Sequence, residues 1–425
     1  QGSNWYDPND LKNNAALQCK RPLPWPLQSR HPLESLVVPT VSMMVDRRTQ
    51  GNHLWRDAMA LEVGDVRVAF EVLRERDKLP ADYQEIDTHM VFDIKMGTLQ
   101  RKARLVAGSH KTEPPASITY ASVVSRDSVR IAFTLAALNG LEVMAADAKN
   151  AYLNAACDER VWTVLGPEFG SELQGKGAKI VRALYGLKSA GASWRHHLAS
   201  CMEDLGWTSC KADADVWIRP NKKADGSEVY EYILIYTDDI LAVCIDPKEV
   251  LSRIDKYCKL KPGSVTAPDI YLGAKLSEAV TEDGHKMWTQ GSKSYVNEAV
   301  KTVEAWCDDN GMRLPFRNKS PMSSTYRPEL DISPELNDKA ANFYMSCIGV
   351  LRWTIELGRI DLTYECSVLA SHMACPREGH LDAVLRIFSY LKRHDSARIP
   401  FDPTYPEIDE SDFPKNDWTR LYGDV

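Results

Sequence analysis

The stretch EYILIYTDDILAVCI, residues 231–245, places two adjacent aspartates between two runs of apolar residues. Each run is typical of a buried strand, and burial of an unpaired charge is strongly unfavourable. We therefore predict a hairpin in which Tyr236–Asp239 form the turn and ILAVCI is the second strand. Asp238 and Asp239 then lie together at the exposed tip, between two strands of the core.

Adjacent carboxylates repel each other unless cations lie between them. Oxygen ligands suit Mg²⁺, which prefers a few carboxylates together with substrate phosphates. A third carboxylate is expected from Asp147, which ends the apolar strand LEVMAAD and begins a predicted helix. Three carboxylates with two ions suit in-line phosphoryl or nucleotidyl transfer. An adjacent Asp pair alone is weak evidence, because surface loops often contain one.

The composition is that of a globular protein, with 425 residues, 44% hydrophobic and 26% charged. No run of about eighteen apolar residues occurs, so no membrane-spanning helix is predicted. The chain starts at Gln1 without a basic-then-apolar leader, so we expect no secretory signal and a piece of a longer protein.

Ten cysteines without a CxxC pair predict reduced, mostly buried thiols in a cytosolic or nuclear protein. Cys366, His372, Cys375 and His380 lie close in sequence, but their spacing matches no common zinc site. We interpret this segment as a buried amphipathic helix.

The net charge of −7 argues mildly against a nucleic-acid partner. However, the chain has two basic segments without acidic residues, and these suit a polyanion held at a defined place. A solvated charged surface is an equally good interpretation. The segments lie between Asp93 and Glu113 (Lys95, Arg101, Lys102, Arg104, Lys111) and between Glu172 and Glu203 (Lys176, Lys179, Arg182, Lys188, Arg195).

Periodicity predicts the order of the elements. Pro-rich residues 1–50 indicate an extended arm or linker. HMVFDIK and RKARLVAG alternate as the strands of a hairpin, and SVRIAFTLAALNG (128–140) predicts a helix ended by Asn-Gly. Residues 191–207 predict an amphipathic helix, and DVWIRP and EVYEYILIY predict strands. From about residue 275 we expect mostly helix, then an irregular acidic end.

Several distinctive segments follow one another along the chain. They are KARLV (102–106), DAKNAYLN (147–154), ALYGLK (183–188) followed by Trp194, YTDD (236–239), YLG (271–273), SCIGVLRW and REGHLDAVLRIFSYLKRH. In this order they resemble the reverse transcriptases of copia-type (Pseudoviridae) long-terminal-repeat retrotransposons, which are part of a Pol polyprotein. The resemblance runs over roughly residues 55–425, and several motifs in order are far more specific than one.

This resemblance implies an α+β right-hand polymerase, with fingers, a palm built on a ferredoxin-like antiparallel sheet, and a thumb followed by a helical connection region. The expected divisions are an arm at 1–50, fingers at 51–135, a palm at 136–275 with room for fingers insertions, thumb and connection helices at 276–400, and an irregular acidic tail at 401–425. The tail would precede a ribonuclease H domain that is absent, so DNA would be made without degradation of the RNA strand.

The resemblance also implies an RNA-directed DNA polymerase that extends a primer with release of pyrophosphate. Asp147, Asp238 and Asp239 would be catalytic and would bind two Mg²⁺ ions, for which Mn²⁺ can substitute. Tyr152 would lie under the sugar and exclude a ribose 2′-hydroxyl, although a core aromatic is the alternative. The implied nucleotide-binding residues are Lys102, Arg104, Ala148, Asn150, Ala151, Tyr152, Tyr185, Gly186 and Lys188. The implied primer and template contacts are Tyr236, Thr237, Tyr271, Leu272, Gly273, Arg386, Lys392 and Arg393; for the last three, a solvated face is nearly as good an interpretation.

The sequence departs from the family pattern at two places. Thr237 stands where the family usually has Val, and Ser189, Ala190 and Gly191 stand where it tends to have Gln-Ala-Pro. The second departure affects template-side contacts and leaves the metal site intact.

The partners implied are an RNA or DNA template with its primer, deoxynucleoside triphosphates, and a second copy or other products of the polyprotein, with no membrane. The expected location is the cytoplasm, in virus-like particles, with the nucleus as a further site. Two alternatives stay open. One is a retroelement fragment, inactive or adopted by a host, that binds nucleic acid or protein. The other is a nucleotide cyclase on the same palm, against which the basic hairpin and thumb-like helices argue.

Overall fold

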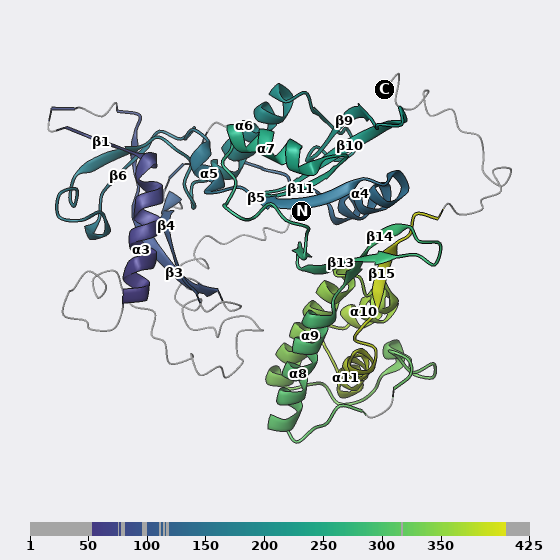
Figure 1. The fold of residues 1–425 in the computed structure, drawn as a ribbon. Coiled ribbons are helices and arrows are strands. Elements are labelled where there is room, and N and C mark those ends of the chain that lie inside the picture. The colour runs from purple at the N-terminus through teal and green to yellow at the C-terminus, as the bar shows by residue number, and fades with distance from the viewer. Residues whose placement is uncertain are drawn as a thin grey trace, which may run out of the picture.

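The computed structural model describes residues 53–404, apart from 75, 78–80, 96–99, 110–111, 114, 116–118 and 316–317. The predicted arm at 1–50 and most of the predicted acidic tail lie outside these residues. Figure 1 shows a central sheet between helices, a smaller N-terminal part on one side and a helical C-terminal part below. Among the described residues, no helix is both long enough and apolar enough to cross a membrane.

The central sheet has five antiparallel strands in the order β5-β11-β10-β9-β8. They are β5 (Glu142–Asp147), β8 (Thr208–Ser209), β9 (Val216–Lys222), β10 (Glu228–Tyr236) and β11 (Asp239–Cys244). The predicted hairpin is confirmed, with Tyr236 opposite Asp239 at its turn. On the other side of β11, Asp239 lies opposite Asp147. The sheet therefore brings the three predicted carboxylates to one end of two neighbouring strands.

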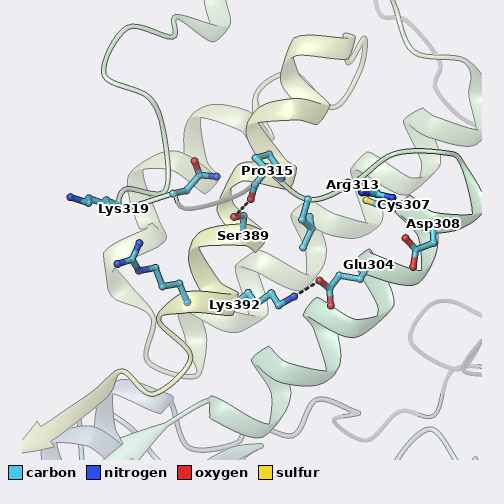
Figure 2. Close-up of a pocket in the computed structure, with 11 residues that line it drawn as sticks. Glu304, Cys307, Asp308, Arg313, Pro315, Lys319, Ser389 and Lys392 are labelled. Atoms are coloured by element: carbon cyan, nitrogen blue, oxygen red, sulfur yellow. Dashed lines mark hydrogen bonds and ion pairs between the residues drawn. The ribbon is translucent and has the colours of Figure 1, made fainter.

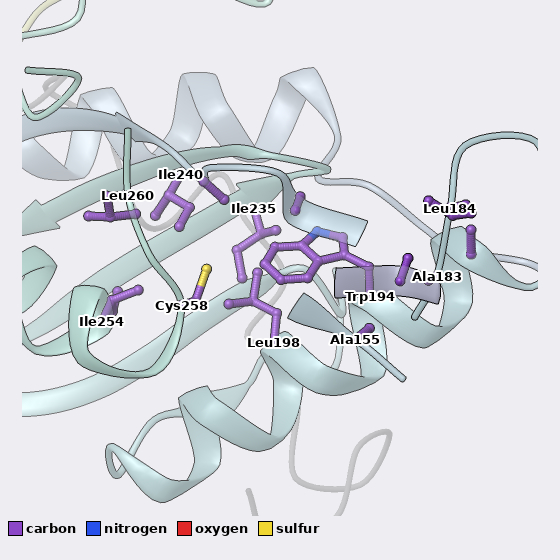
Figure 3. Packing of buried hydrophobic residues seen from close by; sticks show 14 of the residues in the cluster. Ala155, Ala183, Leu184, Trp194, Leu198, Ile235, Ile240, Ile254, Cys258 and Leu260 are labelled. Atoms are coloured by element: carbon purple, nitrogen blue, oxygen red, sulfur yellow. The ribbon is translucent and has the colours of Figure 1, made fainter. Parts of the chain in front are cut away.

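Both faces of this sheet are covered, because the side chains of a strand alternate between its faces. Ile235 and Ile240 belong to the core under α6 (Ala190–Asp204) and α7 (Pro247–Tyr257). Leu234 and Leu241 belong instead to the core with α4 (Arg126–Asn139), on the opposite face. Figure 3 shows the first of these cores, where Trp194 and Leu198 of α6 approach Ile235.

Local signals set the ends of α4. The Ser125 side chain accepts a hydrogen bond from the Ser128 N–H at the start. Gly140 ends the helix with φ of +57°, and its N–H bonds to the carbonyls of Ala136 and Ala137. The predicted stop at Asn-Gly is confirmed.

The N-terminal part contains the predicted basic hairpin, whose two strands pair from Thr88 to Ala107. Trp55 packs edge-on against Phe92, with ring centroids 5.6 Å apart, and so attaches α3 to this hairpin. A second sheet has the order β1-β7-β6-β2. The elements are α3 (His53–Val66), β1 (Phe70–Val72), β2 (Gln84–Glu85), β3 (Thr88–Lys95), β4 (Gln100–Ala107), α5 (Ala151–Asn154), β6 (Val161–Val164) and β7 (Gly177–Ile180).

The C-terminal part combines a sheet of order β12-β13-β14-β15 with helices. The expectation of mostly helix from residue 275 is wrong for the first segment, where AKLSEAV alternates with period two and Gly284, with φ of +84°, turns the chain into β14. The elements are β12 (Ile270–Tyr271), β13 (Ala274–Val280), β14 (Lys286–Gly291), α8 (Lys293–Asp309), α9 (Asp338–Glu356), α10 (Thr363–Ala370), α11 (Glu378–Arg393) and β15 (Arg398–Phe401). Sheets that are antiparallel apart from the β2–β6 pair, together with separate helices, confirm the α+β class.

The segment from Cys366 to His380 is not one helix, contrary to the prediction. It is divided between α10, which ends at Ala370, and α11, which begins at Glu378. Pro376 explains the break, because proline has no N–H for a helical hydrogen bond and restricts the residue before it. His380 is buried, and its Nδ1 accepts a hydrogen bond from the Arg377 N–H at 3.1 Å, which caps α11.

Candidate active site

The three aspartates converge because the strand ends are in register. Asp147 is the last residue of β5 and Asp239 is the first of β11, and their Cα atoms are direct partners. Asp238 lies in the hairpin turn, and its carbonyl accepts a hydrogen bond from the Ala148 N–H at 2.7 Å. The turn is therefore tied to the strand that carries Asp147.

The hairpin turn is strained at Thr237, whose φ is +56°. A β-branched residue rarely adopts this left-handed conformation, which costs about 1–3 kcal/mol and persists only when the surroundings impose it. The buried indole of Trp194 supplies that restraint, because its Nε1–H donates to the Thr237 carbonyl at 2.8 Å. Helix α6 thus holds the turn that presents Asp238 and Asp239.

Lys261 is a site residue that the sequence analysis missed. The segment after α7 runs along β5, where the Lys261 N–H donates to the Asp147 carbonyl at 2.8 Å. The Lys261 Nζ lies 3.0 Å from Asp147 Oδ2 and 3.7 Å from Asp238 Oδ2. The Pro262-Gly263 that follows was the available signal, because it predicts a turn that can bring a lysine back towards the sheet.

The carboxylates of Asp147, Asp238 and Asp239 repel one another when they are ionised. Burial, a hydrogen bond with Asp147 and the charges of Asp238 and Asp147 together raise the pKa of Asp239 to about 7, while Lys261 opposes the shift. Among the described residues, no three His, Cys, Asp or Glu side chains are arranged to hold a metal ion as they stand. The donor set itself, three carboxylates at one point, suits a hard divalent cation, which would take the place of the Lys261 contacts.

Two tyrosines lie beside the carboxylates. The rings of Tyr152 and Tyr185 meet edge to face with centroids 4.9 Å apart, and the Arg104 guanidinium lies 5.6 Å from the Tyr185 ring centroid. Burial, and then the charge of Asp238, raise the pKa of both phenols. Tyr152 also lines the same cavity as Thr237, so the aromatic pair lies beside the turn.

The predicted helix start is wrong by a few residues. Helix α5 begins at Ala151, after Asn150 with φ of +49°, and not immediately after Asp147. The N–H of Ala148 bonds to Asp238, and that of Lys149 bonds to the Lys259 carbonyl at 2.7 Å. These N–H groups are already used, because the chain here still pairs like a strand. Ala148 therefore does not offer its N–H to a triphosphate.

The basic hairpin approaches the site through β4. Lys102 and Arg104 are two positions apart on this strand and so face the same way. Burial first, and then Arg104 and Lys261, lower the pKa of Lys102, while Asp238 acts in the opposite direction. Lys102 is thus close enough to the site for the charge of Asp238 to affect its pKa.

Gly186 lets the end of β4 approach the segment that carries Tyr185. The Ala107 N–H donates to the Tyr185 carbonyl at 2.7 Å. Gly186 has φ of +92°, and a Cβ there would lie 2.2 Å from the Ala107 carbonyl oxygen, so only glycine fits. Lys188 donates to the Thr112 carbonyl at 2.5 Å. Its amine therefore supports this junction, and the nucleotide contact of Lys188 stays a prediction.

The predicted primer contact is the turn between β12 and β13, at Tyr271–Gly273. Leu272 and Gly273 have φ of +47° and +82°, and burial together with the Asp239 charge raises the pKa of Tyr271. In the part of the chain described, the non-glycine residues with positive φ are Asn150, Thr237 and Leu272. Each lies in a predicted site segment, and backbone strain tends to collect at functional sites.

Arg386, Lys392 and Arg393 are not brought to the carboxylates. They lie on α11 in the helical part (Figure 1), where Lys392 Nζ is 2.6 Å from Glu304 Oε1. Figure 2 shows Lys392 with Lys319 in a pocket of about 920 Å³. Arg386 donates to Ser320 Oγ at 3.2 Å. The contact of these three residues with a duplex backbone stays a prediction.

Comparison with known proteins gives one family profile, that of the reverse transcriptases (RNA-dependent DNA polymerases), which matches residues 73–316. A putative Ty5-1 transposon protein of Saccharomyces cerevisiae is 27% identical over 254 residues, which are 58% of this chain and 74% of that protein. The Pol polyprotein of transposon RE1 from Arabidopsis thaliana is 24% identical over 79% of this chain. That of transposon TNT 1-94 from Nicotiana tabacum is 25% identical over 74% of this chain.

The chain spans only 22% and 24% of the lengths of the RE1 and TNT 1-94 polyproteins. Among solved structures, a foamy viral protease-reverse transcriptase in complex with dsDNA is similar, with a TM-score of 0.37 and 13% identity. The match covers 92% of this chain and 69% of that one. This TM-score is too low to support an inference.

Proposed function

This chain belongs to the reverse transcriptase (RNA-dependent DNA polymerase) family, in its copia-type branch, and we propose that it extends a primer on a nucleic-acid template by adding deoxynucleotides. Family membership confirms the resemblance carried by the sequence motifs. The observation that supports catalysis most strongly is the register of β5 and β11, which pairs Asp147 with Asp239 beside the strained turn.

We infer that Asp147, Asp238 and Asp239 hold two divalent cations, Mg²⁺ or Mn²⁺. When bound, the ions would lower the pKa of the attacking primer 3′-hydroxyl and neutralise negative charge on the phosphates. The primer 3′ oxygen then forms a bond to the α-phosphorus as the bond to pyrophosphate breaks. Before the ions can bind, the Lys261 Nζ must leave Asp147 Oδ2 and Asp238 Oδ2, from which it now lies 3.0 and 3.7 Å.

The nucleotide would lie between β4 and the tyrosine pair. Lys102 and Arg104 would meet the triphosphate, where preorganised positive charge is most effective. Tyr152 would contact the sugar from below and exclude a 2′-hydroxyl. The Tyr185 ring packs edge to face against the Tyr152 ring, with centroids 4.9 Å apart, and so restricts the movement of the Tyr152 ring. This restriction supports a steric role for Tyr152.

In this proposal the N-terminal part acts as fingers, the central sheet as palm and the C-terminal helices as thumb and connection. The partners are an RNA or DNA template, its primer and deoxynucleoside triphosphates. Association with a second copy or with other polyprotein products, and residence in cytoplasmic virus-like particles or the nucleus, belong to the same proposal.

Primer extension on oligo(dT)-primed poly(rA) with Mg²⁺ or Mn²⁺ tests the function. The native chain should extend the primer, Asp238→Asn should not, and Asp283→Asn, in the exposed turn after β13, should behave as the native chain does. Extension by neither the native chain nor either variant, with salt-dependent duplex binding retained, would reject catalysis and favour the nucleic-acid-binding fragment.

A further inference from the structure

Two arginines of α4 contact the end of α9, at the point where the central sheet meets the C-terminal helices. The Arg126 guanidinium lies over the Trp353 ring, 4.2 Å from its centroid. Its Nη1 lies 3.6 Å from Glu356 Oε2, which is a charge contact rather than a hydrogen bond. Arg130 Nη2 donates to the Glu356 carbonyl at 2.9 Å. We call these four residues the α4–α9 latch.

The latch suits the chemistry of a helix end. Glu356 is the last residue of α9, and the final carbonyls of a helix lack partners within the helix and carry partial negative charge. Arg130 satisfies one of those carbonyls. A planar guanidinium stacks on an indole face as an ammonium cannot, so arginine suits the contact with Trp353 better than lysine does.

The far edge of Trp353 meets the predicted primer turn. A Cβ placed on Gly273 would lie 3.3 Å from Trp353 Cζ2 and 3.5 Å from Leu357 Cδ2. Leu272, next to it, is held at φ of +47°. Arg126 and Leu272 also line the same small cavity as Glu356. Trp353, although 41% exposed, therefore contacts both the Arg126 guanidinium and the strained turn.

We propose that the α4–α9 latch positions the Tyr271–Gly273 turn relative to the carboxylates, so that Arg126 acts as a positioning residue for the primer end. This inference rests on the proposed polymerase function. α4 packs under the strands that carry the aspartates; Arg126 contacts the indole beside the turn, and Arg130 holds the end of the helix that carries it. A displacement of the primer end by about 1 Å is enough to lower the rate of transfer about a hundredfold.

The kinetic test compares Arg126→Ala and Arg126→Lys with Arg352→Ala, a matched control on the exposed side of α9. Arg126→Ala should lower the rate of nucleotide incorporation by up to about a hundredfold, raise the KM for primer-template roughly tenfold and shorten the product run, with little change in the KM for the deoxynucleotide. Arg126→Lys should recover only part of the loss. Equal changes in both KM values, or full recovery by lysine, would overturn the role.

A second measurement is independent of polymerisation. Hydrogen exchange of the peptide spanning residues 268–276 should be faster in Arg126→Ala and in the milder Glu356→Gln than in the native chain. Exchange in β11 should not change. Unchanged exchange at the turn overturns the proposed latch, whereas faster exchange in a chain that extends no primer supports the latch and rejects the polymerase function.

Discussion

Trp194→Phe tests whether α6 holds the turn that carries Asp238 and Asp239. The change removes the Nε1–H that donates to the Thr237 carbonyl at 2.8 Å, and it keeps an aromatic ring in the core. Trp194 is only 2% exposed, so water does not readily replace the lost donor. The Thr237 carbonyl is then left without this partner, beside a backbone at φ of +56°.

The magnitude follows from two competing terms. Loss of the partner of this partly buried carbonyl costs about 1–3 kcal/mol. The strain at Thr237, also about 1–3 kcal/mol, favours a relaxed turn as soon as the restraint is removed. A shift of about 1–3 kcal/mol towards the relaxed turn lowers the ratio of native to relaxed turn by about 5- to 150-fold. We expect kcat/KM for nucleotide incorporation to fall by up to that factor.

The assay is single-nucleotide incorporation, with Trp207→Phe as the control, since Trp207 is buried in the same core. Both variants should melt at a lower temperature, and only Trp194→Phe should lose incorporation. Adding Thr237→Gly should restore part of the loss, because glycine adopts positive φ without strain. Incorporation by Trp194→Phe at the native rate, or a double variant no better than the single one, would refute the reasoning.

Four further predictions follow from the geometry. Tyr152→Val should raise ribonucleotide relative to deoxynucleotide incorporation, and Tyr152→Phe should not, as competition between the two nucleotides will measure. Gly186→Ala should lower the melting temperature more than Gly140→Ala, because its Cβ meets the Ala107 carbonyl at 2.2 Å whereas Gly140 has open space. Lys261→Ala should increase the rise in melting temperature caused by Mg²⁺ relative to EDTA, since the carboxylates lose their internal counter-charge. Burial alone would raise the pKa of Asp331, but hydrogen bonds from Ser333 and Tyr326 lower it to about 2 from its ordinary 3.8. The resulting stabilisation is present above 3.8 and is lost as pH falls towards 2, so Asp331→Asn should destabilise the chain at pH 7 and differ less from the native chain near pH 2.

The elements that could be predicted from sequence are those with local signals. The YTDD hairpin followed from apolar runs on either side of charge, and α4 followed from its period and its Asn-Gly stop. The β13–β14 hairpin was missed although its alternation was present, because the helical patterns after it dominated the interpretation. Pro376 likewise marked the break between α10 and α11 in plain sequence.

The contacts that complete the site could not be predicted in this way. Lys261 reaches Asp147 across 114 positions, and Trp194 reaches Thr237 across 43. Periodicity describes which face of an element is buried, and it carries no information on which distant side chains meet there. The resemblance supplied Trp194 as a motif residue, but its hydrogen bond to the strained turn emerged only from the fold.

The junction at Gly186 fixes the end of the β3–β4 hairpin that lies at Ala107, while its other end extends away from this attachment. Ala107 is bonded to Tyr185, and Ser109 Oγ donates to the Gly186 carbonyl, so rotation of β3 and β4 would pivot near residue 107. At about 3.3 Å per residue, Arg104 lies about 10 Å and Lys102 about 17 Å from that pivot. A rotation of the hairpin by about 10° would therefore move Lys102 by about 3 Å and Arg104 by about 2 Å. If the hairpin rotates, the two cations on one face of β4 would therefore move by different distances, with Lys102 moving farther than Arg104.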